Sequence, residues 1–108
     1  MKVSHHPDYV LPLPEGHPFP MAKYALVHQL LLERGVIGAP DVLAPDEASA
    51  ADLARVHTSD YLEKLFGPGL SADEQRRLGV PWSARLLRRS RLAVQGTLGL
   101  AREIGATL

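Results

Sequence analysis

The densest group of side chains able to carry chemistry lies at residues 4–9, SHHPDY, which contain His5, His6 and Asp8. Imidazole and carboxylate groups bind zinc and transfer protons, so a metal site or an acid–base site is the first hypothesis for this stretch. Adjacent residues of a strand point to opposite faces, so His5 and His6 do not reach one metal ion without distortion. No His-x-x-x-His or His-x-x-Glu-His spacing occurs in the chain. We therefore predict no metal ligand here and interpret the stretch as an arm held by histidine hydrogen bonds.

The remaining candidate nucleophiles and bases also favour structural roles. His28 falls on the apolar face of a predicted helix, where a core or interface role is expected. His57 stands between two short helices, where an imidazole can satisfy free backbone groups. Ser83 and Ser90 have no neighbouring base, and the chain contains no cysteine, so nucleophilic catalysis has no support.

One basic cluster stands out between residues 76 and 91. It consists of Trp82 and the arginines Arg76, Arg77, Arg85, Arg88, Arg89 and Arg91. Guanidinium groups pair well with phosphates, but the formal net charge of the chain is +0, so nucleic acid is not an expected partner. A solvated helix face or a contact surface for an acidic partner is the preferred interpretation.

The composition is that of a globular protein. The chain has 108 residues, of which 45% are hydrophobic and 22% are charged, enough for one small domain. It shows no secretory signal and no apolar stretch long enough to span a membrane. We expect a cytoplasmic, bacterial protein with no membrane contact.

The first half of the chain predicts two short strands around one helix. Residues 2–5 form the first strand, and the proline-rich residues 6–16 form an irregular arm because prolines cannot donate to a ladder. A helix is predicted from Pro20 to Arg34, with Gly35 as its left-handed stop. A second strand is expected over residues 41–44.

The second half is predicted to be helical. Helices are expected after a Ser49 cap, after a Thr58 or Ser59 cap as far as Gly67, from Ser71 to Gly79, and over residues 83–103. Gly96 and Gly99 cost stability inside the last helix, so close packing against a neighbour is expected at both. Gly105 is predicted to end this helix, and residues 106–108 to begin a parallel strand.

Two or three short strands separated by helices cannot bury a parallel sheet on both faces. The chain is therefore interpreted as the front part of a larger α/β domain, with a small, mostly helical domain as the alternative. The alternative interpretation of function is that the chain is a self-standing helical interaction module. It would bind a partner through the Arg/Trp segment 76–91 or through an exposed apolar face.

Three segments resemble the histone deacetylase superfamily. HPDYVLPLPEGHPFPMAKYALVHQLLLERG is similar to the family's opening, in which an arm ending in Gly-His-Pro leads into the first helix. ASAADLARVHTSDYLEKL resembles its next signature, and AVQGTLGLAREIGATL resembles the small-residue helix before the catalytic strand and loop. The HPF…AK form of the first segment looks closer to class IV deacetylases and to bacterial, acetoin-utilisation-like relatives than to class I.

The resemblance implies an arginase-like, three-layer α/β/α fold with a mostly parallel sheet. It also implies one zinc ion, held by an Asp-x-His pair and a second aspartate, and hydrolysis of acetyl-lysine or a related acetylated amine. The family's Gly-Gly-x-His-His motif would follow Leu108, so residues 1–108 are expected to be the N-terminal segment of one deacetylase domain. This segment is expected to carry no catalytic residue and no zinc ligand, and to be inactive alone.

Four residues are implied to lie at the family's pocket or internal cavity. Tyr9 lies in the arm that contributes to the pocket wall, His17 and Pro18 match the Gly-His-Pro turn, and Lys23 matches the basic position that lines the cavity beneath the metal. Residues 79–81, Gly-Val-Pro, stand where class I members carry an acidic residue that clamps a peptide, which disfavours a histone-like substrate. The expected partners of the complete domain are an acetylated protein or a small acetylated amine. A homo-oligomer through exposed apolar surface is also expected.

Overall fold

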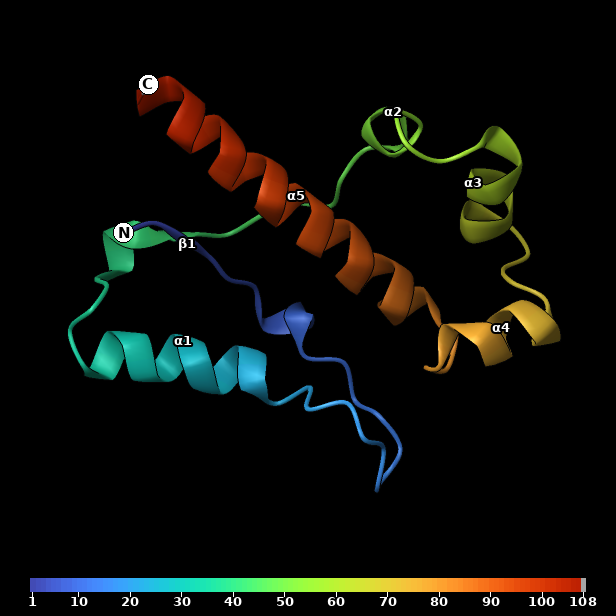
Figure 1. The fold of residues 1–108 in the computed structure, drawn as a ribbon, viewed down its shortest axis with the longest axis horizontal. Helices are drawn as coiled ribbons and strands as arrows, with labels where there is room; N and C mark the ends of the chain where they lie inside the picture. The colour runs from blue at the N-terminus through green and yellow to red at the C-terminus, as the bar shows by residue number, and fades with distance from the viewer. Residues whose placement is uncertain (108) are drawn as a thin grey trace.

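A parallel pair of short strands lies between two helices. The computed structural model describes residues 1–107, and in it β1 (Val3–Ser4) pairs with β2 (Val42–Leu43) in the register Val3 to Val42 and Ser4 to Leu43. Helices α1 (Lys23–Glu33) and α5 (Ala84–Thr107) lie on opposite sides of this pair (Figure 1). The strands predicted at 2–5 and 41–44 are thus confirmed, in shorter form.

The arm between β1 and α1 is irregular, as predicted, apart from one short 3₁₀ helix. This helix, η1 (Pro7–Tyr9), begins with a proline and is capped by His6, whose Nδ1 accepts a hydrogen bond of 3.0 Å from the backbone of Asp8. The prediction of an arm held by histidine hydrogen bonds is therefore confirmed at His6. Tyr9 at the end of η1 is buried.

Helix α1 starts later than the sequence suggests and ends where predicted. Its N-cap residue, Ala22, makes no side-chain cap, and residues 21–22 form a turn before the helix. At its other end, Gly35 adopts φ 69°, and the amide of Val36 donates to the carbonyl of Leu31. This is the left-handed stop that glycine permits. A second 3₁₀ helix, η2 (Ala39–Asp41), then leads into β2.

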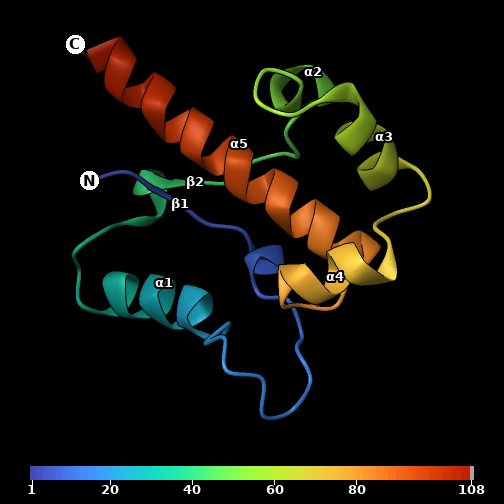
Figure 2. The same ribbon diagram turned by 45° about the vertical axis from the view of Figure 1, so that its right-hand side comes forward.

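Three short helices follow β2, each with a side-chain cap. In α2 (Ala50–Leu53), α3 (Ser59–Phe66) and α4 (Ala72–Leu78), the caps are Ser49, Thr58 and Ser71. Ser71 and Glu74 form a reciprocal capping box, and Gly79 ends α4 with φ 79°. In both views, α2 and α3 lie on the side of α5 away from α1 (Figures 1 and 2). The predicted caps are confirmed because hydroxyl capping depends only on residues a few positions apart.

Helix α5 runs further than predicted. It was expected to end near Glu103, but it continues through Gly105 to Thr107, so a strand at residues 106 and 107 is wrong. A glycine stops a helix by adopting a left-handed conformation, and Gly105 does not adopt one. Leu108, the rest of that prediction, lies outside the described residues.

Two small apolar clusters flank α5. One comprises Leu11, Met21 and Leu86, with Trp82 packed against it, and the other comprises Ala48, Leu53 and Leu62. Leu92 of α5 is the largest fully buried side chain of the described residues. The molecule measures 45 × 37 × 16 Å, so its apolar interior is thin. Along residues 1–107, no helix is both long enough and apolar enough to cross a bilayer.

Candidate functional site

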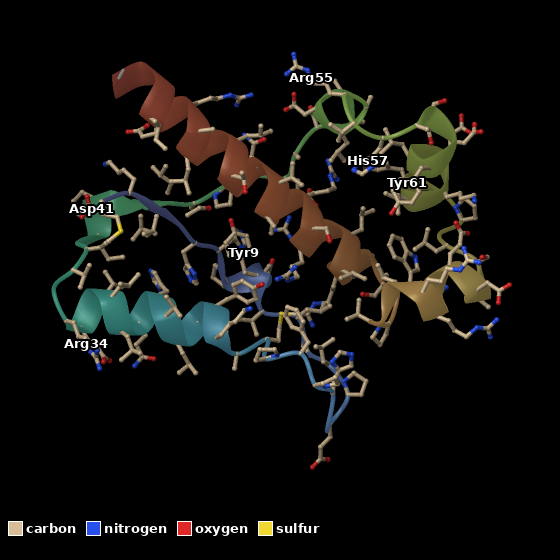
Figure 3. All side chains as sticks on the ribbon, in the orientation of Figure 1. Tyr9, Arg34, Asp41, Arg55, His57 and Tyr61 are labelled. Carbon is tan, nitrogen blue, oxygen red and sulfur yellow. The ribbon has the colours of Figure 1, made fainter. Side chains whose placement is uncertain are left out.

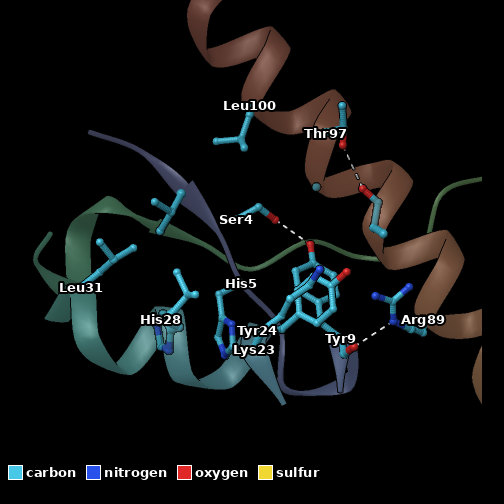
Figure 4. Close-up of a pocket in the computed structure, with 14 residues that line it drawn as sticks. Ser4, His5, Tyr9, Lys23, Tyr24, His28, Leu31, Arg89, Thr97 and Leu100 are labelled. Carbon is cyan, nitrogen blue, oxygen red and sulfur yellow. Dashed lines mark hydrogen bonds between the residues drawn. The ribbon is translucent and has the colours of Figure 1, made fainter. Parts of the chain in front are cut away.

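A pocket of about 550 Å³ lies between α1, β1 and α5 (Figure 4). Its wall is mostly apolar, with a few polar groups gathered near the end of β1. The lining residues are Val3, Ser4, His5, Tyr9, Lys23, Tyr24, Val27, His28, Leu31, Arg89, Ala93, Gly96, Thr97 and Leu100. Of the four residues that the family resemblance assigns to a pocket or cavity, Tyr9 and Lys23 lie in this wall.

Tyr9 is held rigidly at one side of the pocket. Its Oη lies 2.7 Å from the Oγ of Ser4 and donates to the backbone carbonyl of Leu92 at 3.4 Å. Figure 3 shows the ring between α1 and α5. Because Tyr9 is part of η1 and its hydroxyl bonds to α5, it fixes the distance between the arm and α5.

Gly96 makes this approach of α5 possible. A Cβ at residue 96 would overlap both the Oγ of Ser4 and the Oη of Tyr9. The expectation of close packing is confirmed here. At Gly99 it is wrong, since none of the described atoms lies within 4 Å of a Cβ built there.

Two cations face the Tyr24 ring at the pocket. The Nζ of Lys23 lies 5.2 Å from the ring centre, and the guanidinium of Arg89 lies 4.9 Å from it. Arg89 also donates from Nε to the carbonyl of Tyr9 at 2.8 Å. The described lining contains no Asp or Glu, so this corner of the pocket is electropositive and suits a small anion or a carbonyl oxygen.

His5 and His28 stack at the same wall. Their ring centres lie 3.7 Å apart and their planes differ by 6°. Burial, and next the neighbouring His28 and His6, lower the pKa of His5. His28 is thus a contact residue between two elements, the role the sequence predicted, whereas nothing in the sequence pairs it with His5.

His17 and Pro18 lie away from the pocket. The Nε2 of His17 is 2.9 Å from the carbonyl oxygen of Gly79, and its Nδ1 accepts from the amide of Phe19 at 3.2 Å. Pro18 is exposed in the adjoining bend. The Gly-His-Pro turn therefore connects the arm to the end of α4 and does not line the pocket. His57, expected to bond backbone groups, instead places its ring 5.3 Å from that of Tyr61 (Figure 3).

The arginine cluster is largely engaged within the chain. Arg88 pairs with Asp8 at 3.1 Å and with Glu47 at 3.6 Å, and Arg91 also lies 3.6 Å from Glu47. Arg76 pairs with Asp73. Arg89 bonds the carbonyl of Tyr9, and Arg91 donates to the carbonyl of Ala48. Much of the predicted interaction surface therefore attaches α5 to residues 8–9 and 47–48 within the chain. The sequence assigns Arg89 to the basic cluster, but no local pattern in it indicates that this residue lies at the pocket.

The donor side chains that a metal ion would need do not gather within the described part of the chain. Among residues 1–107, no three His, Asp or Glu side chains gather closely enough to hold a metal ion. The Nδ1 of His6 is occupied as the cap of η1, and it lies 4.0 Å from the carboxylate of Asp8.

Comparison with known proteins identifies the family of the chain. Residues 17–107 match the family described as the histone deacetylase domain. An uncharacterized protein from Picosynechococcus is 47% identical over 96 residues, which are 89% of this chain and 32% of that protein. The acetoin utilization protein AcuC of Bacillus subtilis is 34% identical over 95 residues, covering 81% of this chain and 24% of that protein.

The probable histone deacetylase 1-A of Xenopus laevis is 33% identical over 51 residues, covering 47% of this chain and 11% of that protein. The chain thus spans about a third or less of the length of these curated relatives. The match covers the end of the arm, α1, β2, the capped helices and α5, so it includes the two helices that line the pocket but not β1 or Tyr9. The chain belongs to the histone deacetylase domain family.

Proposed function

We propose that this chain forms the N-terminal part of a zinc-dependent, cytoplasmic deacetylase domain that hydrolyses acetyl-lysine or a related acetylated amine. The family match over residues 17–107 is the observation that carries the proposal. The relative from Bacillus, whose printed name refers to acetoin utilization, supports a bacterial enzyme of this type.

The arrangement of the elements supports a three-layer α/β/α domain. The amide of His5 donates to the carbonyl of Leu43, so the backbone groups of Ser4 point away from β2, because alternate residues of a strand bond to opposite neighbours. The pocket runs along this open side of β1, between α1 and α5. Another parallel strand at this edge would extend the sheet and be covered by helices on both faces, as parallel sheets require.

Zinc does not fit the described residues, because no group of His, Asp and Glu side chains is placed to hold it. The proposal assigns the metal ligands and the acid–base histidines to the part of the domain that the relatives have and this chain does not span.

The role proposed for this chain is to build one wall of the cavity behind the reaction centre. Tyr9 is fixed by Ser4 and by α5, while Lys23 and Arg89 supply positive charge without a carboxylate in the described lining. Amide hydrolysis releases a small carboxylate, which this charge would stabilise. Residues 79–81, Gly-Val-Pro, lack the acidic residue by which class I members clamp a peptide, and this favours small acetylated amines over histone tails.

The proposal is tested by comparing the 108-residue chain with a protein that continues it to the length of its relatives. The longer protein should bind one zinc ion per chain and hydrolyse an acetyl-lysine reporter or an acetylated polyamine, with loss of activity on chelation. The chain alone should show neither property. Chelator-sensitive turnover by the chain alone would disprove its silence, and a zinc-loaded longer protein inactive on every acetylated amine would disprove the activity.

An interaction role is the second candidate, favoured by the exposed apolar side chains of α1. Leu26, Val27 and Leu30 are 55%, 53% and 43% exposed. Such a face drives association when nothing covers it, and the proposed partner is a second copy of the chain. The Arg/Trp segment is not the favoured surface, because Arg88, Arg89 and Arg91 bond within the chain. Light scattering of the chain over a range of concentrations would show a rising mass if this face associates, and a constant monomer mass if it does not.

A further inference from the structure

Two imidazoles from elements far apart in the sequence lie face to face at the pocket. His5 directly follows β1 and His28 lies in the middle of α1, and their ring centres are 3.7 Å apart (Figure 4). The ring of His5 also meets that of Tyr9 edge-on, with centres 6.2 Å apart and planes at 88°. We refer to His5 and His28 together as the histidine stack.

The histidine stack is an important attachment of α1 because this helix has few others. No residue of α1 is fully buried. Tyr24 contributes a second aromatic contact, with its ring centre 6.4 Å from that of Tyr9. Met21 before the helix and Ile37 after it are buried and anchor its two ends. The middle of α1 therefore depends on aromatic contacts with the arm and with the end of β1.

The surroundings of the stack do not favour an added proton. His5 contacts His28 from α1 and Tyr9 from the arm, and the charge of His6 also acts on it. Lys23 and Arg89 line the same pocket, and no carboxylate is part of its described lining. The carboxylate nearest in the sequence, Asp8, is outside the pocket lining and pairs with Arg88 at 3.1 Å. A proton on His5 would therefore place positive charge in a mostly apolar pocket that two cations already line.

We propose that the histidine stack makes the attachment of α1 to β1 depend on pH, firm while the His5 ring is neutral and weakened when that ring binds a proton. Burial and the charges of His28 and His6 lower the pKa of His5 below its ordinary value of 6.5. The unfolded chain therefore binds a proton at His5 more readily than the folded chain does. The contribution of His5 to the free energy of unfolding is fully present above pH 6.5 and is lost as the pH falls through the pKa of the folded state. If the proposed function holds, this loosening would also open the deacetylase cavity, and that consequence rests on the proposed function. The titration of His5 does not depend on it.

The test is a histidine titration by NMR of the chain with labelled imidazoles, between pH 8 and pH 5. His5 should titrate with a midpoint below 6.5. In His28→Phe, which keeps a flat ring but removes the second ionisable group, the His5 midpoint should rise. In the control His57→Phe, on the far side of α5, the His5 midpoint should not move. A His5 midpoint at or above 6.5 in the unaltered chain, or one insensitive to His28→Phe, would overturn the proposal.

A second measurement keeps the proposal testable without the deacetylase activity. The urea midpoint of the chain should fall between pH 7.5 and pH 5.5, and the fall should be smaller in His5→Phe and His28→Phe than in His57→Phe. An equal fall in all three variants would overturn the proposal. Because no acetylated substrate is used, failure here is distinct from failure of the proposed function.

Discussion

Gly96 of α5 lies so close to Tyr9 that any side chain at residue 96 would enter the space of the tyrosine hydroxyl. The contact joins the last helix to the arm that precedes the first, and it sets one wall of the pocket. It also sets the first testable prediction.

Gly96→Ala should destabilise the chain by roughly 1–3 kcal/mol, the usual cost of overpacking a close contact. Gly99→Ala is the matched control, one turn further along α5, where a Cβ meets none of the described atoms within 4 Å. Because alanine is the better helix former, the control should be neutral or should stabilise by up to about 1 kcal/mol. Urea denaturation of the two variants measures the difference. Equal effects would show that α5 does not pack on the arm at Gly96.

Removing either hydroxyl of the Ser4–Tyr9 pair should weaken the same wall. Ser4→Ala and Tyr9→Phe should each cost about 1 kcal/mol, because each leaves a polar group without its 2.7 Å partner. The double variant should cost less than the sum of the two, because the Ser4–Tyr9 hydrogen bond is lost in all three variants, whereas the bond from Tyr9 to the Leu92 carbonyl is lost only when Tyr9 is changed. Strictly additive costs in this cycle would show that the two hydroxyls do not interact.

Arg89 should matter for stability where Arg85 does not. Arg89→Met removes the 2.8 Å bond to the Tyr9 carbonyl and the contact with the Tyr24 ring, so a loss of about 1–2 kcal/mol is expected. Arg85 has no partner among the described residues, and Arg85→Met should change stability by less than about 0.5 kcal/mol. Thermal melts of both variants at one ionic strength decide between these outcomes.

The capping box of α4 should make part of the stability depend on acid. The amide of Ser71, then its hydroxyl and Lys64, lower the pKa of Glu74 from 4.5. The contribution of Glu74 is therefore present above that value and is lost as the pH falls through the folded pKa. Melts between pH 6 and pH 3 should be less pH-dependent in Glu74→Gln than in Glu63→Gln, an exposed carboxylate of α3. A Ser71→Ala variant should cost about 1 kcal/mol near neutral pH.

Local chemistry could be predicted from the sequence, and long-range contacts could not. Ser49, Thr58 and Ser71 cap helices by accepting from the amide three positions further on, so their roles follow from spacing alone. Gly35 and Gly79 stop helices for the same local reason. Gly105 has the same residue type in a similar place, yet the helix continues, because glycine permits a left-handed stop without enforcing one.

The pocket depends on which residues meet across the fold. Tyr9 and Lys23, which only the family resemblance assigns to a pocket or cavity, line this one, and His17, named with them, lies 2.9 Å from the Gly79 carbonyl oxygen. Arg89 and the histidine stack had no sequence signal, because their partners lie on elements whose relative positions the pattern does not define. Gly96 and Gly99 of α5 make the same point, since these identical residues three positions apart face a tyrosine and open space.

The contacts that fix the arm span most of the chain. Arg88 reaches Asp8 and Arg89 reaches Tyr9 across 80 residues, and the Tyr9 hydroxyl reaches Leu92 across 83. Pairings of this separation form late, because a large loop must close before they contribute. A ribosome releases the arm long before α5, so residues 6–16 lack these contacts until α5 has been synthesised. The order of translation thus makes an early segment of the chain wait for a much later one before it acquires its structure.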